Sequence, residues 1–508
     1  MAEKVHRVAV VGGGISGLAA CRFVQKRLQD SCSSGSKRII LIEQGQRLGG
    51  WLHSLRTPEG FVFEAGPSSI RTVGSKGRAT LRLVDELGLR QHVVPCSSLA
   101  IKNRYLYTNG SLLRLPNHPL KVLGSPLMRS AVFAFLREWT VPRSQQPDES
   151  IHSFFTRRFS PVVADTLTDA LSIGIFGGRS QSLSIKSCFP FLHEYEQKYG
   201  SIGLGMLREM LASRSGQEKN EKNQNTKTTK NEAAAEEEEE TDEGYLSPAV
   251  QEMQKMQVYS FREGVETLSR ALEQKIREDE HTDILLNTAV ERMDQERDGT
   301  MSLSLGHGMT VRAEKVISAL PSHALAHCLR HHPTLEQDML KIPFASLALV
   351  HLAYTEPLLP AGVEGFGYLV PAMEKQPILG VQFNSSAFPQ QDPQPGCTRF
   401  TVMMRVEKGQ ENRTKDEWQA IALDSLQRHL RLPPAKTAAL ASPARVNVSV
   451  DLNAIPQYVV GHAALVDSIR GALQRDFPSL HLVGNSWGGV GVNDCVENAW
   501  RTVHRLQL

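Results

Sequence analysis

Three glycines near the start of the chain have the spacing of a turn that binds phosphate. Gly12, Gly14 and Gly17 follow the apolar residues VAVV and precede a stretch with helical periodicity. In such a turn the first glycine allows the bend, the second lets a pyrophosphate approach the backbone, and the third lets the helix pack against the strand. The helix amino terminus then faces the phosphate charge. This pattern predicts a dinucleotide site between a strand and a helix.

A carboxylate at the end of the next apolar stretch supports the same site. The residues KRIILIEQ have the composition of a buried strand that ends in Glu43, which is placed to accept hydrogen bonds from a ribose. A carboxylate there also disfavours the 2′-phosphate of NADP. The polar residues QDSCSSGSK make the distance from the glycines longer than the roughly 20 residues of the usual fingerprint. A glycine turn without a nucleotide is the alternative.

The elements that must position these residues follow from hydrophobic periodicity. The helix after the glycines has an apolar stripe of Leu18, Cys21, Val24 and Leu28. Further along, VYSFREGVETLSRALEQKI predicts a strand and then an amphipathic helix, while DILLNTAVERM and KVISALP predict strands. The residues from about 217 to 243 lack aromatic and branched apolar side chains and therefore predict a disordered insertion.

Composition excludes several classes of protein. The chain has 508 residues, 41% of them hydrophobic, which is enough for two or three domains. Its formal net charge of +3 gives no reason to expect nucleic acid as a partner. The seven cysteines are scattered and never form a CxxC pair, so neither a disulfide framework nor a metal site is predicted.

Membrane contact is predicted at the surface only. No apolar stretch approaches the ~20 residues that a membrane-spanning helix needs, and the first strand begins too early to leave room for a cleavable presequence. Residues 121–139 combine apolar residues at helical spacing with Lys121, Arg129 and Arg137. Periodicity alone favours a buried helix of a helical subdomain, with a membrane-surface helix as the alternative.

Three further motifs carry a resemblance to a known superfamily. After Glu43 come Arg47, Leu48, Gly49 and Gly50, then FEAGPSSIR at residues 63–71, and near the end LHLVGNSWGGVGVNDCVENAWRTV. Together they resemble the signatures of the flavin amine oxidase superfamily. The last motif predicts a strand, a glycine loop and a helix capped by Asp494, with Glu497 three residues later. The resemblance implies FAD, held without a covalent bond because GNSWGG contains no cysteine.

Along nearly its whole length the chain is similar to the protoporphyrinogen oxidase family, most specifically in SIKSCFP, AIPQYVVGH and GVGVNDCVE. The resemblance implies an α/β (α+β) fold in which a Rossmann-like FAD-binding domain comprises residues 1–100, 255–325 and 450–508. A helical membrane-binding domain would span 101–215, the acidic insertion 216–250, and a mixed-sheet substrate-binding domain 326–449.

The activity that the resemblance implies is the six-electron oxidation of protoporphyrinogen IX to protoporphyrin IX in haem biosynthesis. Hydride passes to FAD, and dioxygen is the acceptor and gives hydrogen peroxide. The family forms homodimers bound peripherally to the mitochondrial inner membrane, on the intermembrane-space side and close to ferrochelatase. On the basis of this resemblance, we interpret residues 121–139 as a membrane-surface helix and not as a buried one.

The resemblance also assigns site residues. Those matching FAD-binding positions are Gly12, Gly13, Gly14, Ile15, Ser16, Gly17, Glu43, Gln44, Arg47, Gly50, Trp51, Gly66, Pro67, Ser68, Ser69, Val290, Gly484, Asn485, Val490, Gly491 and Val492. Those matching substrate positions are Arg104, expected to pair a propionate, and Gly174, Phe366, Gly367, Leu369 and Met403. No acid-base pair is assigned, and His323 is interpreted as a surface or cap residue.

Some positions depart from the family pattern. Ser68, Ile173, Glu263, Arg405 and Val406 stand where relatives have other residues, so the electrostatics near the flavin and substrate differ from theirs. A flavin-dependent amine oxidase or a carotenoid-type desaturase is the alternative with the same cofactor. A nucleotide-fold scaffold that binds a partner or lipid without redox turnover is the alternative of another class.

Overall fold

The computed structural model describes residues 5–30, 38–116, 132–135, 137–211 and 247–508. The predicted disordered insertion therefore lies almost wholly outside the described residues, as do residues 121–131 of the predicted membrane segment. Residues 248–250, which we had placed in that insertion, instead begin the helix α12 (Pro248–Gln254). Pro248 is at the first turn of this helix and Ser247 caps it, which is the usual chemistry of a helix start.

A seven-stranded sheet forms the first layer of the fold. Its strand order is β10-β2-β1-β13-β12-β11, with β19 also paired to β13. β10, β2, β1, β13 and β19 are parallel, whereas β12 and β11 are antiparallel additions. The bounds are β1 (Val5–Val11), β2 (Ile39–Ile42), β10 (Thr282–Leu285), β11 (Val290–Gln295), β12 (Met301–Leu305), β13 (Thr310–Ser318) and β19 (Leu480–Leu482).

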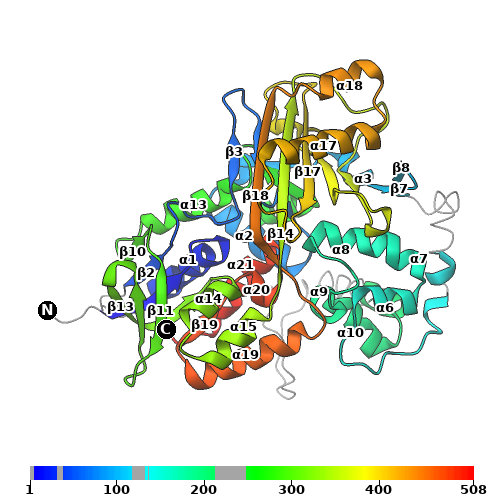
Figure 1. Ribbon diagram of the computed structural model, residues 1–508. Coiled ribbons are helices and arrows are strands. Elements are labelled where there is room, and N and C mark those ends of the chain that lie inside the picture. The colour runs from blue at the N-terminus through cyan, green and yellow to red at the C-terminus, as the bar shows by residue number, and fades with distance from the viewer. Residues whose placement is uncertain (1–4, 31–37, 117–131, 136, 212–246) are drawn as a thin grey trace, which may run out of the picture.

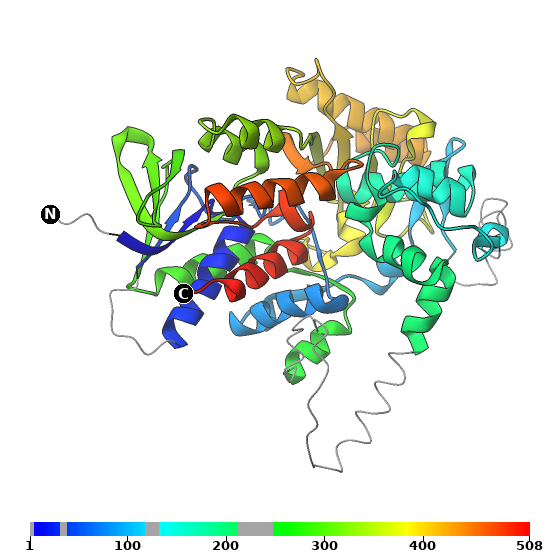
Figure 2. The ribbon, with the colours of Figure 1, turned by 90° about the horizontal axis from the view of Figure 1, so that it is seen from below.

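Helices cover both faces of this sheet. On one face lie α1 (Ile15–Asp30), α2 (Gly74–Glu86), α12, α13 (Glu266–Arg277) and α21 (Val492–Arg505), which share one apolar core. The predicted stripe of α1 is confirmed, because all four side chains are buried in that core. On the other face lie α14 (Ser322–Cys328), α15 (Pro333–Leu340) and α19 (His462–Asp476). Figure 2 shows α21, in red, running beside α1 and α2.

A second seven-stranded sheet has the order β18-β14-β17-β16-β15-β7-β8. Only the β15–β7 pair is parallel, so the predicted mixed sheet is confirmed. One face packs against α17 (Lys415–Leu430) and α18 (Pro434–Leu440). The strands are β7 (Tyr105–Thr108), β8 (Ser111–Arg114), β14 (Phe344–Tyr354), β15 (Gly367–Leu369), β16 (Gly380–Phe383), β17 (Thr398–Arg405) and β18 (Arg445–Pro456).

Short helices gather at one end of the molecule (Figure 1). They are α6 (Ile151–Arg158), α7 (Pro161–Val163), α8 (Asp169–Phe176), α9 (Ile185–Cys188) and α10 (Pro190–Tyr199), followed by helical residues 202–211. The remaining elements are β3 (Ser54–Arg56), β4 (Val62–Glu64), β5 (Ile70–Arg71), β6 (Val93–Pro95), α3 (Ser98–Lys102), β9 (Val258–Phe261), α16 (Asn384–Ala387) and α20 (Asn485–Gly488). β5, β9 and β6 form a small sheet between the two large ones.

The boundaries of the sheets differ from the boundaries expected from sequence. β7 and β8 pair in the second sheet, although the helical segment was expected to start at residue 101. β18 continues past residue 450 in that same sheet, and α14 and α15 pack on the first sheet although residue 326 was expected to begin the other domain. Strand pairing across large sequence distances, which local periodicity does not report, accounts for these differences.

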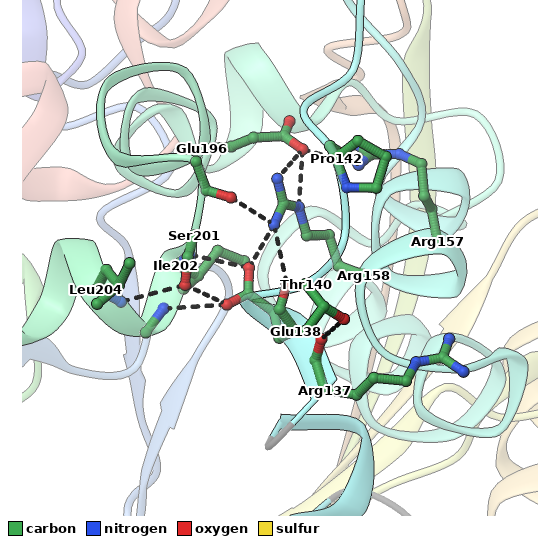
Figure 3. Close-up of polar contacts among 12 residues, drawn as sticks. Arg137, Glu138, Thr140, Pro142, Arg157, Arg158, Glu196, Ser201, Ile202 and Leu204 are labelled. Carbon is green, nitrogen blue, oxygen red and sulfur yellow. Dashed lines mark hydrogen bonds and ion pairs between the residues drawn. The ribbon is translucent and has the colours of Figure 1, made fainter.

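A buried ionic network holds the helical end together (Figure 3). The Arg158 guanidinium is fully buried and ion-pairs with Glu138 at 2.7 Å and with Glu196 at 2.5 Å. Glu138 also accepts hydrogen bonds from the Ile202 backbone at 2.9 Å and the Ser201 hydroxyl at 2.5 Å. Burial acts to raise the pKa of Glu196, but Arg157 and Arg158 outweigh it and hold that pKa below its ordinary value. The network thus joins four separate segments.

Arg158→Met is expected to lower the free energy of unfolding by about 3–5 kcal/mol, because it leaves the buried Glu138 carboxylate without its cation and Glu196 with Arg157 alone. Urea denaturation of the FAD-bound protein, followed by circular dichroism, measures the change. The matched control is Arg428→Met, which breaks an exposed ion pair with Asp424 within α17 and should cost less than about 1 kcal/mol. Equal losses in both variants would contradict a special role for the network.

Candidate functional site

The glycine turn between β1 and α1 is packed too closely for side chains. A Cβ added to Gly17 would lie 1.8 Å from the Gly12 carbonyl oxygen, and one on Gly13 would lie 2.3 Å from the Leu48 side chain. Gly12 has a φ of +99°, a conformation that favours glycine. The predicted strand, turn and helix are therefore confirmed. With no side chain in the way, the backbone amides at the start of α1 can approach a pyrophosphate.

Glu43 follows β2 directly, as the sequence predicted. One carboxylate oxygen accepts from the Gly13 amide and the other from the Gly45 amide, both at 2.7 Å. Each oxygen keeps a second lone pair for a further donor, so the carboxylate is fixed in place with acceptor capacity left for a ribose hydroxyl. The Thr288 amide donates to the Glu43 carbonyl at 3.0 Å, which brings the loop leading to Val290 beside this edge.

The second glycine pair closes the turn from the other side. The Gly49 amide donates to the Gly13 carbonyl at 2.8 Å, and a Cβ on Gly50 would lie 3.0 Å from the Gly14 Cα. The Arg47 guanidinium donates to the Gly50 carbonyl at 2.7 Å and remains exposed. Gly66 packs on the Trp51 backbone, where an added Cβ would lie 2.2 Å from the carbonyl oxygen. These contacts bring together the Arg47–Trp51 and Gly66–Ser69 segments.

The loop after β19 completes the cradle at its carboxyl-terminal side. Gly484 has a φ of +113° and lies against Ala319 and the Ser16 hydroxyl. α21 begins at Val492, and Asp494 accepts from the Gly491 amide at 2.9 Å from inside its first turn. The expectation that Asp494 is the cap residue is thus wrong, because Gly491 occupies the cap position and Asp494 is the third residue of the helix. Val490 packs against the helical end of the molecule.

The cradle fits FAD. Three glycine-lined backbone segments converge on one helix start, and a fixed carboxylate stands at the end of the neighbouring strand. The described cysteines are buried or half-buried, and the loop of residues 484–491 contains none. When bound, FAD supplies the electron-accepting ring. The groups that would hold it are the backbone amides of the glycine turn for the pyrophosphate, Glu43 for the ribose and the amino terminus of α21 for the ring.

An apolar surface lies on the second sheet, on the face away from α17. Tyr368, Val402 and Met404 point into the core under α17. Because side chains alternate along a strand, Leu369 and Met403 occupy the opposite face, where both are partly exposed. Gly174 of α8 covers this face, since an added Cβ would lie 2.8 Å from the Leu369 side chain. Four of the six predicted substrate residues, Gly367, Leu369, Met403 and Gly174, therefore meet at this surface.

α8 is held over this surface by its two ends. The Asp169 carboxylate accepts from the Ala372 amide at 2.9 Å, just after β15, and from the Ser180 hydroxyl at 2.8 Å. Arg405 donates to the Gly177 carbonyl at the other end of α8. Burial, with a smaller contribution from Arg179, lowers the pKa of Arg405. This departure from the family pattern thus has a structural partner, and Ile173 is simply buried.

The segment of residues 66–71 connects the cradle to the apolar surface. The Ser68 hydroxyl and the Gln382 side-chain amide are within 2.8 Å, and Gln382 of β16 pairs with Gly367. Arg104 stands at the start of β7, next to Asn103, whose carbonyl accepts from the Phe366 amide at 3.1 Å. The predicted substrate residues Arg104 and Phe366 are therefore neighbours, and both border the sheet that carries Leu369.

Sequence reasoning missed three polar residues of this region. The buried Tyr458 hydroxyl donates to the Asn485 carbonyl and accepts from the Gly489 amide at 2.8 Å. Asn493 donates to the Arg71 carbonyl at 2.8 Å, and Gln382 contacts Ser68. Tyr458 belongs to the motif AIPQYVVGH, and that motif was the one signal in the sequence that pointed to any of these three residues.

His323 packs edge-on against Phe344, and burial lowers its pKa.

Comparison with known proteins defines the class first. The model of the flavin containing amine oxidoreductase family matches residues 15–507, so the chain belongs to that family and is an FAD-dependent oxidoreductase. A crystal structure from Exiguobacterium sp. shares the fold with a TM-score of 0.73, at 22% identity over 99% of this chain and 98% of that one.

Within this class the relatives are more specific. Protoporphyrinogen oxidase of Homo sapiens is 35% identical over 498 residues, which cover 97% of this chain and 96% of the relative. Protoporphyrinogen oxidase of Schizosaccharomyces pombe is 31% identical, with 98% of each chain covered. The chain is thus a member of the protoporphyrinogen oxidase family.

Gly17→Ala is expected to weaken FAD binding about tenfold or more, because the added methyl group overlaps the Gly12 carbonyl and separates α1 from β1. The ratio of flavin to protein absorbance after dialysis measures this. Gly471→Ala is the matched control. Its Cβ would meet only the end of the Arg475 side chain at 3.8 Å, and alanine favours the interior of α19. Full flavin content in Gly17→Ala would exclude this turn from the cradle.

Proposed function

We propose that this protein oxidises protoporphyrinogen IX to protoporphyrin IX, with noncovalently bound FAD as electron acceptor and dioxygen as the final oxidant. The observation that carries the proposal is the apolar surface of Leu369 and Met403, bordered by Phe366 and joined to the cofactor cradle through Ser68 and Gln382. A large, mostly apolar macrocycle with acidic side arms needs such a surface with a cation at its border. Arg104 provides that cation.

The electron balance fixes the stoichiometry. Loss of six electrons and six protons from the porphyrinogen requires three dioxygen molecules, each reduced to hydrogen peroxide. The role of the chain in this reaction is to orient the macrocycle and to exclude water from its reacting edge. Gly174 contributes by leaving room beside Leu369, where any side chain would occupy the space above the sheet. No described side chain is assigned as an acid or base.

The activity is tested with purified protein and protoporphyrinogen IX in air, by following porphyrin fluorescence and peroxide together against a heat-inactivated control. We expect about three peroxide molecules per porphyrin. Gly174→Val should lower kcat/KM about tenfold or more with FAD content unchanged, because its side chain overlaps Leu369. Gly471→Val, in α19, controls for valine in a helix. A yellow protein that forms no porphyrin above the control would reject this substrate and keep the cofactor.

A second part of the proposal concerns the membrane. Phe133, Phe135 and Trp139 are exposed, and so are Leu204, Met206, Leu207, Met210 and Leu211 on the helical residues 202–211. Phe135 lies 3.5 Å from the position of a Cβ on Gly203, so the two groups are continuous. Figure 2 shows the 202–211 helix at the edge of the helical end. No helix among the described residues has both the length and the hydropathy to cross a bilayer.

This exposed apolar patch, with Arg137 and Arg208 nearby, has the chemistry of a surface that rests on a membrane. We propose that this membrane is the mitochondrial inner membrane, that the protein lies peripherally on its intermembrane-space side, and that it acts there as a homodimer close to ferrochelatase. The patch supports the membrane contact, and the family resemblance supports the rest. The helical membrane-binding domain of this proposal comprises the described residues 132–135 and 137–211. It excludes β7 and β8, which belong to the second sheet.

The double variant Leu207→Glu/Met210→Glu is expected to lose most liposome binding in a flotation assay, because it puts two charges into the apolar patch. Its oxidation of porphyrinogen in detergent should be unchanged. The matched control is Leu452→Glu, which charges an equally exposed leucine, 52% accessible, on β18. Flotation of the double variant at the wild-type level would remove the patch from the membrane contact.

A further inference from the structure

Two arginines stand beside the proposed substrate surface without an acidic partner. The side chains of Arg71 and Arg104 are both exposed, and no carboxylate of the described residues forms an ion pair with either. Burial by neighbouring groups and the positive charge of Arg104 together lower the pKa of Arg71, so the two guanidinium groups act on each other. Two like charges held together by a fold favour an anion between them.

The backbone of Arg71 is fixed on both sides. Arg71 ends β5 and pairs with Val258 of β9, and the next amide, of Thr72, donates to the Gln257 carbonyl at 3.0 Å. The Arg71 carbonyl accepts from the Asn493 side chain at 2.8 Å, in the first turn of α21. The same chain segment holds Ser68, which bonds to Gln382 of the second sheet. Arg71 is thus anchored between the cofactor helix and the substrate sheet.

The backbone of Arg104 is fixed by the second sheet. Its carbonyl accepts from the Leu115 amide at 2.8 Å, and the preceding carbonyl, of Asn103, accepts from the Phe366 amide at 3.1 Å. A Cβ added to Gly365 would lie 2.6 Å from the Asn103 carbonyl oxygen, which shows how closely these two segments are packed. The backbone of Arg104 is therefore held close to that of Phe366.

One apolar cluster joins the two arginine-bearing segments. Phe366, next to Arg104, and Val258, opposite Arg71, both pack on the cluster that contains Cys96. The Cys96 amide donates to the Val258 carbonyl at 3.0 Å. Burial raises the pKa of the Cys96 thiol to about 11, and the charge of Arg104 acts against that rise, so this charge lies within reach of the cluster. These backbone and apolar contacts bring the two arginine residues to the same border as Phe366.

We propose that Arg71 is a second carboxylate-binding residue, which works with Arg104 to bind the acidic side arms of the tetrapyrrole and to select free acids over esters. The inference rests on the proposed function and deepens it. Arginine suits this task because its planar fork donates two parallel hydrogen bonds to one carboxylate. Two such groups on one border position a macrocycle with two carboxylate arms in a single orientation over Leu369 and Met403.

The contact with Asn493 suggests the one competing target. Asn493 lies at the amino terminus of α21, which faces the cofactor cradle, so the charge of Arg71 could act on the flavin instead of the substrate. A charge that acts on the flavin changes its reduction potential and affects every substrate alike. A charge that binds carboxylates affects only substrates that carry them. The two cases therefore differ in what they predict for an esterified substrate.

The test compares Arg71→Gln with the wild type on protoporphyrinogen IX and on its dimethyl ester, in the same detergent. We expect KM for the diacid to rise about tenfold to a hundredfold, while KM for the ester, FAD content and flavin reduction potential stay as in the wild type. Arg71→Lys should fall between the two, because it keeps the charge and loses the fork. If Arg71→Gln does not retain FAD, the same comparison of diacid and ester is made with Arg71→Lys.

Arg90→Gln is the matched control, since this arginine pairs with Asp85 on the surface just before β6. Two results would overturn the inference and leave the proposed function standing. In one, Arg71→Gln raises KM equally for the diacid and the ester. In the other, it shifts the flavin reduction potential while the ratio of the two KM values stays unchanged. A wild-type protein that oxidises neither substrate would instead reject the proposed function, and the inference with it.

Discussion

Gly17 lies so close to the Gly12 carbonyl that α1 can leave β1 along only one path. That path fixes where the first amides of α1 point, and the Gly13 amide in turn holds the Glu43 carboxylate. The Gly49 amide then bonds to the Gly13 carbonyl, so the second glycine pair is placed by the first. These two glycine turns are thus positioned largely by each other's backbone atoms. The third segment, residues 484–491, is held instead by side chains, since the Tyr458 hydroxyl bonds to Asn485 and Gly489, and Asp494 bonds to Gly491.

The two large sheets meet through segments that belong fully to neither. Residues 66–71 begin against Trp51 in the cradle, pass Gln382 of the second sheet and end in the small β5-β9-β6 sheet. α8 has the same linking role on the other side, because Asp169 and Gly177 tie it to β15 and β17. The surface where a large substrate could lie is therefore bounded on one side by residues 66–71 and on the other by α8. Each of these segments is held by its own set of hydrogen bonds.

The cradle was largely predictable from sequence, because its determinants are local. A glycine turn, two flanking apolar strands and an acid are contiguous patterns, and the stripe of α1 follows from helical spacing. The start of α21 was misjudged by three residues, since Gly491 and not Asp494 holds the cap position. β7 was placed in the wrong region because its partner β15 is more than 250 residues away. The role of Gln382 depends on a contact of similar range, which no local signal reports.

The packing of α21 between α1 and α2 has a consequence for how the protein is made. α1 is synthesised long before the helix that covers part of its apolar stripe, which comprises residues 492–505. At the ~5–20 residues per second of translation, that stripe waits tens of seconds for its partner. β1 likewise waits for β13, from the middle of the chain. The apolar stripe of α1 therefore stays partly uncovered on the growing chain, and the cradle is complete only after residues 484–492 have been made.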